Sequence, residues 1–158
     1  MEDAGKITIR PFEQADWARL CEIHDAARQD ELALSVGMEA FLSLEQTYEN
    51  EGLFEGQVAV AEIAGTVCGF VAFSDHELTW LYVDPACYRR GVGRALVRHA
   101  KAMARPGMTI EMLEGNLPAI ALYQAEGFVP VERKTGQLIG NEAFAAQGVV
   151  LRHNDGTA

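Results

Sequence analysis

The feature that most constrains the fold is a series of β-type segments followed, after a short loop, by a helical segment that begins at glycines. The stretch GQVAVAEIAGTVCGFVAFSDHELTWLYVDP is rich in β-branched and aromatic residues, and AGT and SDHE interrupt it with turn residues. We predict three strands here, at 58–63, 67–73 and 78–83, with the first two forming a hairpin. The next segment, YRRGVGRALVRHAKAMARPG, has helical periodicity and begins at its glycines.

The flanking segments complete a mixed α/β pattern. KITIRPF predicts a first strand, and apolar spacing predicts helices at 13–32 and 38–50. After the glycine-rich helix we expect a strand at 108–113 and a short helix from Leu117 to Gly127. Two strands, at 128–136 and 144–153, end the pattern. The order β-α-α-β-β-β-α-β-α-β-β predicts about seven strands and four helices, in one mixed sheet.

Length and composition favour one globular domain. The chain has 158 residues, of which 49% are hydrophobic, so we expect a single domain over 1–158 with flexible ends at 1–5 and 153–158. The formal net charge of −10 argues against binding to nucleic acid or to an anionic membrane surface.

The cysteines indicate the compartment. Cys21, Cys68 and Cys87 are far apart and lack metal-ligand spacing, which favours reduced thiols in a cytoplasmic protein without a metal. We see no apolar run long enough for a signal peptide or a membrane span, and we interpret His24 as a packing residue.

The segment YRRGVGRAL predicts a phosphate site. A helix that starts near Gly91 or Val92 leaves its first backbone N–H groups free and carries partial positive charge there. Glycines allow a ligand to approach the backbone closely, and arginines add charge. We therefore assign Arg89, Arg90 and Arg94 to phosphate binding.

The same region is locally basic. Residues 85–110 contain no Asp or Glu, and they hold six of the 13 basic side chains. Arg98, Lys101 and Arg105 continue the helical stripe that starts at Arg94, and we interpret these three as a solvated outer face.

The residues around the glycines limit which phosphate ligands fit this segment. No GK[ST] follows the glycines, so a P-loop is excluded. A dinucleotide fingerprint fits in part, because Gly91 and Gly93 match and Glu111 follows at a suitable distance, but Leu96 occupies the third glycine position.

Two motifs resemble the GCN5-related N-acetyltransferase (GNAT) family. The coenzyme loop of that family reads Q/R-x-x-G-x-G/A, and residues 88–93 read YRRGVG, with Tyr88 where Gln or Arg is usual. The second motif of the family, N-x-x-A-x-x-x-Y-x-x-x-G-F, has the same residue types here, at Asn116, Ala119, Tyr123, Gly127 and Phe128. The departure at Tyr88 implies that this residue acts through its backbone.

The resemblance implies acetyl-CoA as co-substrate and transfer of its acetyl group to a primary amine by direct attack. The fourth and fifth strands would hold the pantetheine between them, and residues 88–94 would hold the pyrophosphate. The implied coenzyme-binding residues are Leu81, Tyr82, Val83, Tyr88, Arg89, Arg90, Gly91, Val92, Gly93, Arg94, Asn116 and Tyr123.

The resemblance also implies two proton transfers. Tyr123 matches the general acid that protonates the departing thiolate, and Glu77 stands where histone-type members carry a glutamate base. Other candidates for the base are Asp75, His76, Glu111 and Glu31.

The sequence decides neither the identity of the amine acceptor nor the oligomeric state. A small-molecule amine and a peptide amine are both compatible with the sequence, and a homodimer is compatible as well. Two other functions compete with acetyl transfer: an inactive acyl-CoA-binding sensor, and a nucleotide-binding protein that uses Gly91, Gly93 and Glu111.

Overall fold

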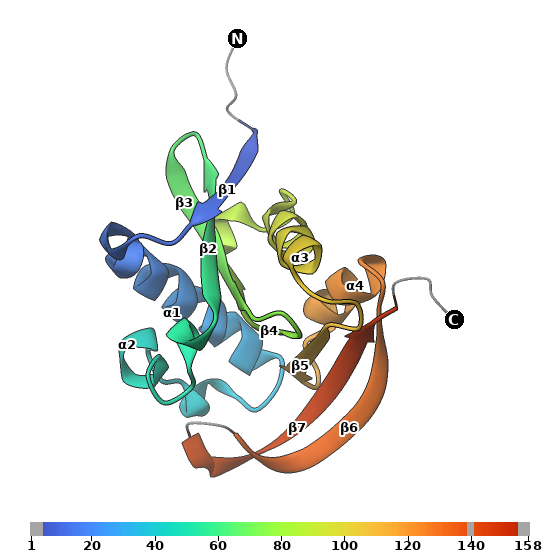
Figure 1. The fold of residues 1–158 in the computed structure, drawn as a ribbon. Coiled ribbons are helices and arrows are strands. Elements are labelled where there is room, and N and C mark those ends of the chain that lie inside the picture. Colours follow the sequence, from blue (N-terminus) through green and yellow to red (C-terminus); the bar gives the residue numbers. More distant parts are fainter. Residues whose placement is uncertain (1–4, 139–140, 155–158) are drawn as a thin grey trace.

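The computed structural model describes residues 5–138 and 141–154, and within them the chain forms one mixed sheet covered by helices (Figure 1). The strands are β1 (Ile7–Pro11), β2 (Gln57–Ile63), β3 (Thr66–Phe73), β4 (Glu77–Val83), β5 (Thr109–Leu113), β6 (Phe128–Leu138) and β7 (Asn141–His153). The α-helices are α1 (Trp17–Ala33), α2 (Leu44–Thr47), α3 (Val92–Met103) and α4 (Leu117–Ala125). The predicted mixed α/β class is confirmed.

The sheet has the order β1-β2-β3-β4-β5-β7-β6. Only β4 and β5 run parallel, and the other neighbouring strands are antiparallel. A parallel pair needs a crossover, and α3 supplies it between β4 and β5. This topology places the glycine-rich start of α3 at the C-terminal end of β4.

Each face of the sheet has its own apolar core. On one face, Leu20 and Ile23 of α1 pack with Phe70 and Trp80. On the other face, α3 packs with Val71 and Phe73 of the sheet through its own apolar side chains, Val92, Leu96, Val97 and Ala100. Full burial of a large aliphatic side chain stabilises the fold by about 1.5–3 kcal/mol, so both helices are firmly fixed to the sheet.

A β-bulge lies at Thr79 in β4. Ala72 pairs with Trp80 and Phe73 pairs with Leu78, so Thr79 is the extra residue. Its hydroxyl donates to the carbonyl oxygen of Ala72 at 3.1 Å. The bulge reverses the alternation of side chains, because Leu78 belongs to the core under α3 whereas Trp80 packs on the side of α1.

The bulge also marks the point where β4 and β5 separate. These strands pair at Glu77–Thr109 and Leu78–Ile110, and within the described residues no ladder joins them beyond that point. Past Thr79, the edge of β4 that faces β5 is therefore open, and Figure 1 shows the two strands diverging.

The predicted helix at 38–50 is wrong. Met38–Ala40 forms a single 3-10 turn, Phe41 is extended, and α2 covers only four residues. The cause is a capping box: Ser43 accepts from the Gln46 backbone N–H, and the Gln46 side chain accepts from the Ser43 N–H at 2.8 Å. Ser43 starts a new helix with an extended backbone of its own, and this interrupts the predicted one.

The predicted flexible ends, 1–5 and 153–158, lie largely outside the described residues. Where the structure does describe the C-terminal side, His153 ends β7, and the Asn154 N–H donates to the Gly127 carbonyl at 2.8 Å. None of the helices within 5–138 and 141–154 is long and apolar enough to cross a membrane.

Candidate active site

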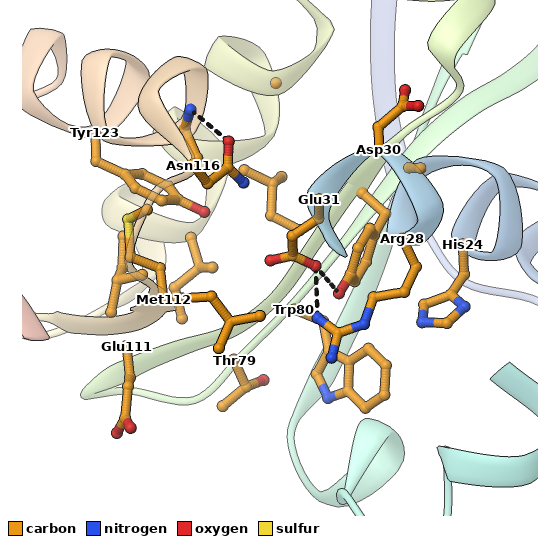
Figure 2. Close-up of a pocket in the computed structure, with 18 of the residues that line it drawn as sticks. His24, Arg28, Asp30, Glu31, Thr79, Trp80, Glu111, Met112, Asn116 and Tyr123 are labelled. Carbon is orange, nitrogen blue, oxygen red and sulfur yellow. Dashed lines mark hydrogen bonds and ion pairs between the residues drawn. The ribbon is translucent and has the colours of Figure 1, made fainter. Parts of the chain in front are cut away.

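A cavity of about 1260 Å³ fills the opening between β4 and β5. Its walls also come from α1, α4, the first turn of α3 and the hairpin of β6 and β7, as Figure 2 shows in part. Predicted coenzyme-binding residues gather at this cavity: Leu81, Tyr82, Val83, Tyr88, Arg89, Gly91, Val92, Gly93, Arg94, Asn116 and Tyr123. Arg90, by contrast, is exposed and is not among the described residues that line the cavity (the described lining).

The start of α3 presents free backbone donors to this cavity. Gly91 is the N-cap and has a φ of +87°, and Arg89 has a φ of +65°. A left-handed backbone costs a non-glycine residue about 1–3 kcal/mol and is typical of ligand sites. Gly93 allows α3 to approach α4, since a Cβ at this position would lie 3.1 Å from Leu122 Cδ2. The N–H groups of the first turn can therefore hold an anion.

The loop before this helix is tied to α1. Arg19 donates through Nη2 to Asp84 Oδ2 at 2.6 Å and through Nε to the carbonyl of Val67 at 2.9 Å. The Ala86 backbone N–H and then Arg19 lower the pKa of Asp84. Tyr88 also reaches α1, since its hydroxyl donates to Asp30 Oδ2 at 3.1 Å. The Tyr88 side chain is thus engaged with α1, which agrees with a backbone role for this residue.

The basic stripe of α3 has a partner that sequence reasoning missed. Glu126 lies just after α4, its side chain is 3% exposed, and it pairs with Arg94 Nε at 3.0 Å and Arg98 Nε at 2.9 Å. Lys101 Nζ donates to the Glu126 carbonyl oxygen at 2.7 Å. Burial favours a higher pKa for Glu126, but the hydrogen bonds from Arg98 and Lys101 outweigh it and lower the pKa.

This partner bears on two interpretations of the basic residues. Arg98 and Lys101 do not form a merely solvated face, because both bind Glu126. Arg94 lines the cavity and is half exposed, and its Nε binds the same carboxylate, so Glu126 shares its guanidinium; its role in phosphate binding stays a prediction. Arg105 pairs with Asp75 at 3.0 Å and is 78% exposed, as expected for the outer face.

Asn116 is the N-cap of α4. Its Oδ1 accepts from the Ala119 N–H at 3.3 Å, which fixes the orientation of the amide. Figure 2 shows the amide nitrogen turned toward the cavity. The oxygen therefore serves the helix, and the nitrogen is left as a donor for a ligand.

Tyr123 projects from α4 into the same space. The residue is 6% exposed, and its hydroxyl has no hydrogen-bond partner among the residues that the structure describes. Burial raises the pKa of Tyr123, and the charge of Glu31 adds to the shift. Its hydroxyl therefore stays protonated at neutral pH and is available as a proton donor.

The candidate bases occupy different places. Glu77 lines the cavity but lies before the bulge, where β4 still pairs with β5. Glu111 is exposed and pairs with Lys134 at 3.5 Å, and Figure 2 shows it pointing away from Tyr123. Asp75 and His76 bind each other at 2.9 Å in the turn before β4, and neither belongs to the described lining.

Glu31, by contrast, occupies the middle of the cavity. Its Oε1 accepts from Arg28 Nη1 at 2.6 Å and from Tyr82 Oη at 2.9 Å, and Figure 2 shows the carboxylate between Arg28 and Tyr123. Burial raises the pKa of Tyr82 well above its ordinary value, and Glu31 adds to the shift. Sequence reasoning did not identify the contacts that Arg28 and the Tyr82 hydroxyl make with this carboxylate.

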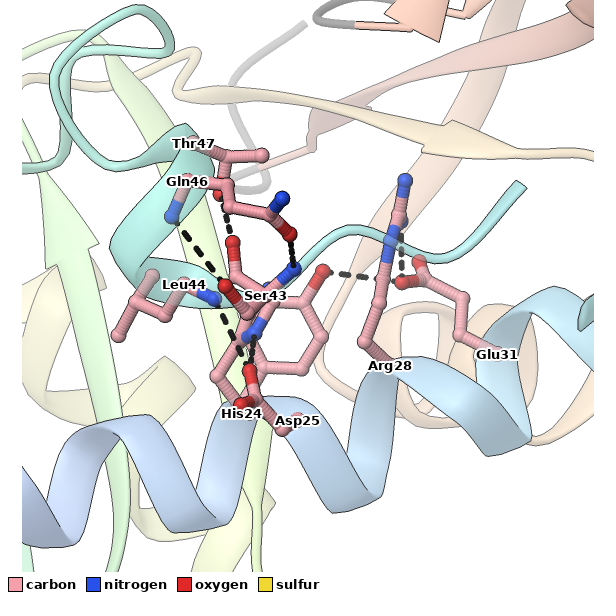
Figure 3. Close-up of polar contacts among 9 residues, drawn as sticks. His24, Asp25, Arg28, Glu31, Ser43, Leu44, Gln46 and Thr47 are labelled. Carbon is pink, nitrogen blue, oxygen red and sulfur yellow. Dashed lines mark hydrogen bonds and ion pairs between the residues drawn. The ribbon is translucent and has the colours of Figure 1, made fainter. Parts of the chain in front are cut away.

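Helix α1 is fixed behind Glu31 by contacts with α2 (Figure 3). Asp25 Oδ1 lies 2.9 Å from His24 Nδ1 and accepts from the Leu44 N–H at 2.9 Å. The His24 ring is 3% exposed and packs against Tyr82 with a centroid distance of 4.8 Å. His24 is thus a packing residue, and no group of three potential metal ligands occurs within the described part of the chain.

Comparison with known sequences points to one family. Residues 54–130 match the sequence model of the acetyltransferase (GNAT) domain. The peptidyl-lysine N-acetyltransferase YiaC of Escherichia coli (strain K12) is 36% identical over 77 residues, which are 48% of this chain and 52% of that protein. YjaB of the same strain, also named a peptidyl-lysine N-acetyltransferase, is 35% identical over 94 residues, 56% of this chain and 63% of that protein. Each match spans less than two thirds of the relative's length.

Comparison with solved structures covers nearly the whole chain. The solution structure of apo YjaB from Escherichia coli has a TM-score of 0.66 at 27% identity and covers 93% of this chain and 97% of that chain. The structure of yncA from Salmonella typhimurium with its cofactor acetyl-CoA has a TM-score of 0.65 at 24% identity and covers 96% of both chains. Residues 54–130 thus resemble the acetyltransferase (GNAT) domain, and the chain shares its fold with these two structures.

Proposed function

We propose that this protein is an acetyl-CoA-dependent N-acetyltransferase that acts on a primary amine. The observation that carries the proposal is one cavity that joins three features: the open edge of β4, the free N-terminus of α3 and the Tyr123 hydroxyl. The backbone groups of the open β4 edge suit an extended amide chain, the N-terminus of α3 suits an anionic group, and the buried phenol of Tyr123 suits an acid. A shared fold with yncA, solved with acetyl-CoA, supports the choice of co-substrate.

The residues at the start of α3 would bind the pyrophosphate. Gly91, Val92, Gly93 and Arg94 would offer backbone N–H groups, and the exposed Arg89 would add charge. Arg90 is equally exposed and would assist from outside the described lining. Because Arg94 is held by Glu126, we assign its contribution to the backbone and to the local field rather than to a direct guanidinium contact.

The open edge of β4 would bind the pantetheine arm. The backbone groups of Leu81, Tyr82 and Val83 lie beyond the bulge, on the stretch that β5 leaves unpaired. Asn116 would donate its amide nitrogen to the same arm, since its oxygen already caps α4. When bound, acetyl-CoA supplies an activated acetyl thioester.

Tyr123 would act as general acid. Its phenol is protonated at neutral pH, as an ordinary tyrosine is, and it would give this proton to the departing thiolate. An acid in the lining of the cavity would accept a proton from the amine. Glu77 is the base expected from the family pattern, and Glu31 is the main alternative.

The names of relatives support a peptide amine as acceptor. Three relatives are named peptidyl-lysine N-acetyltransferases and one is named an N-alpha-acetyltransferase, so we propose a peptide amine, with a small amine as the alternative. We keep a cytoplasmic location and a possible homodimer as expectations, and we propose neither nucleic acid nor a membrane as partner, given the net charge of −10.

The test is a binding and turnover screen on the wild-type protein. Acetyl-CoA should raise the melting temperature, and CoA should be released with at least one class among lysine peptides, peptides with a free N-terminus, polyamines and aminoglycosides. Strong acetyl-CoA binding without turnover on any class would instead favour a sensor. No stabilisation by millimolar acetyl-CoA would contradict the proposal as a whole.

A further inference from the structure

The two oxygens of the Glu31 carboxylate are not equivalent. Oε1 accepts from both Arg28 and Tyr82, whereas no hydrogen bond to Oε2 occurs within the described residues. Figure 2 shows this second oxygen on the side of the carboxylate that faces Tyr123. Because two donors hold Oε1, the carboxylate has little freedom to rotate, and Oε2 stays directed into the cavity.

The position of Glu31 relative to Tyr123 supports a role at the reacting atoms. Glu31 is the charged group that contributes to the raised pKa of Tyr123. The two residues come from opposite walls of the cavity, α1 and α4, and the space between them is where the proposed acid would meet the acetyl thioester. An amine that contacts Oε2 would therefore lie on one side of the acetyl thioester, and Tyr123 would lie on the other.

The charge around Glu31 determines which acceptors fit. The lining on the side of α1 and of the segment before β2 contains four acids: Asp30, Glu31, Glu51 and Glu55. Among the described residues of this wall the cation is Arg28, which binds Glu31. The other described cations of the lining lie elsewhere: Arg89 and Arg94 at the start of α3, where Arg94 binds Glu126, and Lys134 on β6, where it pairs with Glu111. Burial raises the pKa of Glu51, Arg28 opposes the shift, and the negative charge of Glu31 adds to it. This wall favours a cation and disfavours an anion.

We infer that Oε2 of Glu31 binds the ammonium group of a cationic acceptor and takes one of its protons. This inference rests on the proposed function and names the catalytic base and the charge of the substrate. The proton passes from the nitrogen to Oε2 and then to water, and the nitrogen lone pair forms the bond to the acetyl carbon. As the carbon–sulfur bond breaks, Tyr123 gives its proton to the thiolate and regains one from the nitrogen through water, so the protons balance.

The inference assigns supporting roles to two neighbours. Arg28 and Tyr82 do not contact the acceptor; they are positioning residues that direct Oε2 by occupying Oε1. Tyr82→Phe removes one of the two donors and keeps the Glu31 charge. It should therefore lower kcat while leaving KM for the amine nearly unchanged, a split that a merely structural loss would not produce.

The direct test compares Glu31→Gln with two other variants. With Nα-acetyl-lysine amide as acceptor, E31Q should lower kcat/KM about 100-fold, the range of one acid–base group, and keep the Kd for acetyl-CoA within about twofold. Glu49→Gln is the control, because Glu49 is exposed and lies outside the described lining. E31Q with wild-type kcat/KM, or a larger loss in Glu77→Gln than in E31Q, would overturn the inference.

A measurement on the wild-type protein keeps the inference testable if E31Q does not fold. Butylammonium should compete with Nα-acetyl-lysine amide, whereas 1-butanol and butanoate at the same concentration should not. Equal inhibition by the alcohol or the carboxylate would contradict an ammonium site. An acetyl-CoA-stabilised protein that releases no CoA with any amine would instead contradict the proposed function, so the two failures are distinguishable.

Discussion

The ammonium group of Lys101 on α3 donates a hydrogen bond to the backbone carbonyl oxygen of Glu126, just after α4, at an N–O distance of 2.7 Å. The Glu126 carboxylate in turn binds Arg94 and Arg98. This cluster joins the helix that carries the anion site to the helix that carries Tyr123. Glu126 thus links the two halves of the proposed active site, together with the close approach of Gly93 to Leu122.

We predict that Glu126→Gln destabilises the protein. The amide keeps the shape but loses the charge that Arg94, Arg98 and Lys101 bind, so the free energy of unfolding should fall by about 1–3 kcal/mol. Urea denaturation measures the change. Glu132→Gln is the control, because Glu132 is exposed on β6, and this variant should stay within about 0.5 kcal/mol of wild type. Equal stability of the two variants would contradict the role of Glu126.

A second prediction separates backbone strain from ligand binding. Gly91→Ala and Gly65→Ala both place a Cβ on a left-handed backbone, at φ values of +87° and +80°. Both should lose about 1–3 kcal/mol of stability. Only Gly91→Ala should also weaken acetyl-CoA binding, by about tenfold or more, equivalent to about 1.4 kcal/mol. Isothermal titration measures this, and an unchanged Kd in Gly91→Ala would remove the start of α3 from the site.

A third prediction concerns pH. Burial lowers the pKa of His24 in the folded protein, although Asp25 opposes the shift. The unfolded chain therefore binds the proton more readily, and stability should fall as the pH drops below the unfolded value of about 6.5. His24→Asn should show a shallower loss of unfolding free energy between about pH 7 and pH 5. In His76→Asn, where the ring is 73% exposed, the wild-type slope should persist.

The sequence was most informative where local patterns decide the structure. The segments predicted at 58–63, 67–73 and 78–83 form β2, β3 and β4, because turn residues separate regular β-type runs. The helix predicted at 38–50 failed, since periodicity extends across Ser43 but the capping box begins a new helix there. The sequence also gave no sign of the extra residue at Thr79, which opens the site.

The contacts that organise the site join distant segments. Glu31 and Tyr82 are 51 residues apart, and Arg98 and Glu126 are 28 apart. No local propensity reports such a pair, because the pairing depends on how α1 and α4 lie against the sheet. Sequence reasoning therefore proposed Tyr123 and Asn116 from a motif, yet it ranked Glu31 below Glu77 and missed Glu126.

The central claim is that Tyr123 serves acetyl transfer as an acid in the coenzyme cavity. Tyr123→Phe removes only the hydroxyl, and Tyr48→Phe is the matched control, since Tyr48 packs against Trp17 outside the described lining. The decisive measurement is the steady-state rate of CoA release, together with the Kd for acetyl-CoA, in both variants. We predict that Tyr123→Phe lowers kcat about 100-fold with an unchanged Kd, as for loss of one acid–base group, and that Tyr48→Phe equals wild type. A wild-type kcat in Tyr123→Phe would contradict the account.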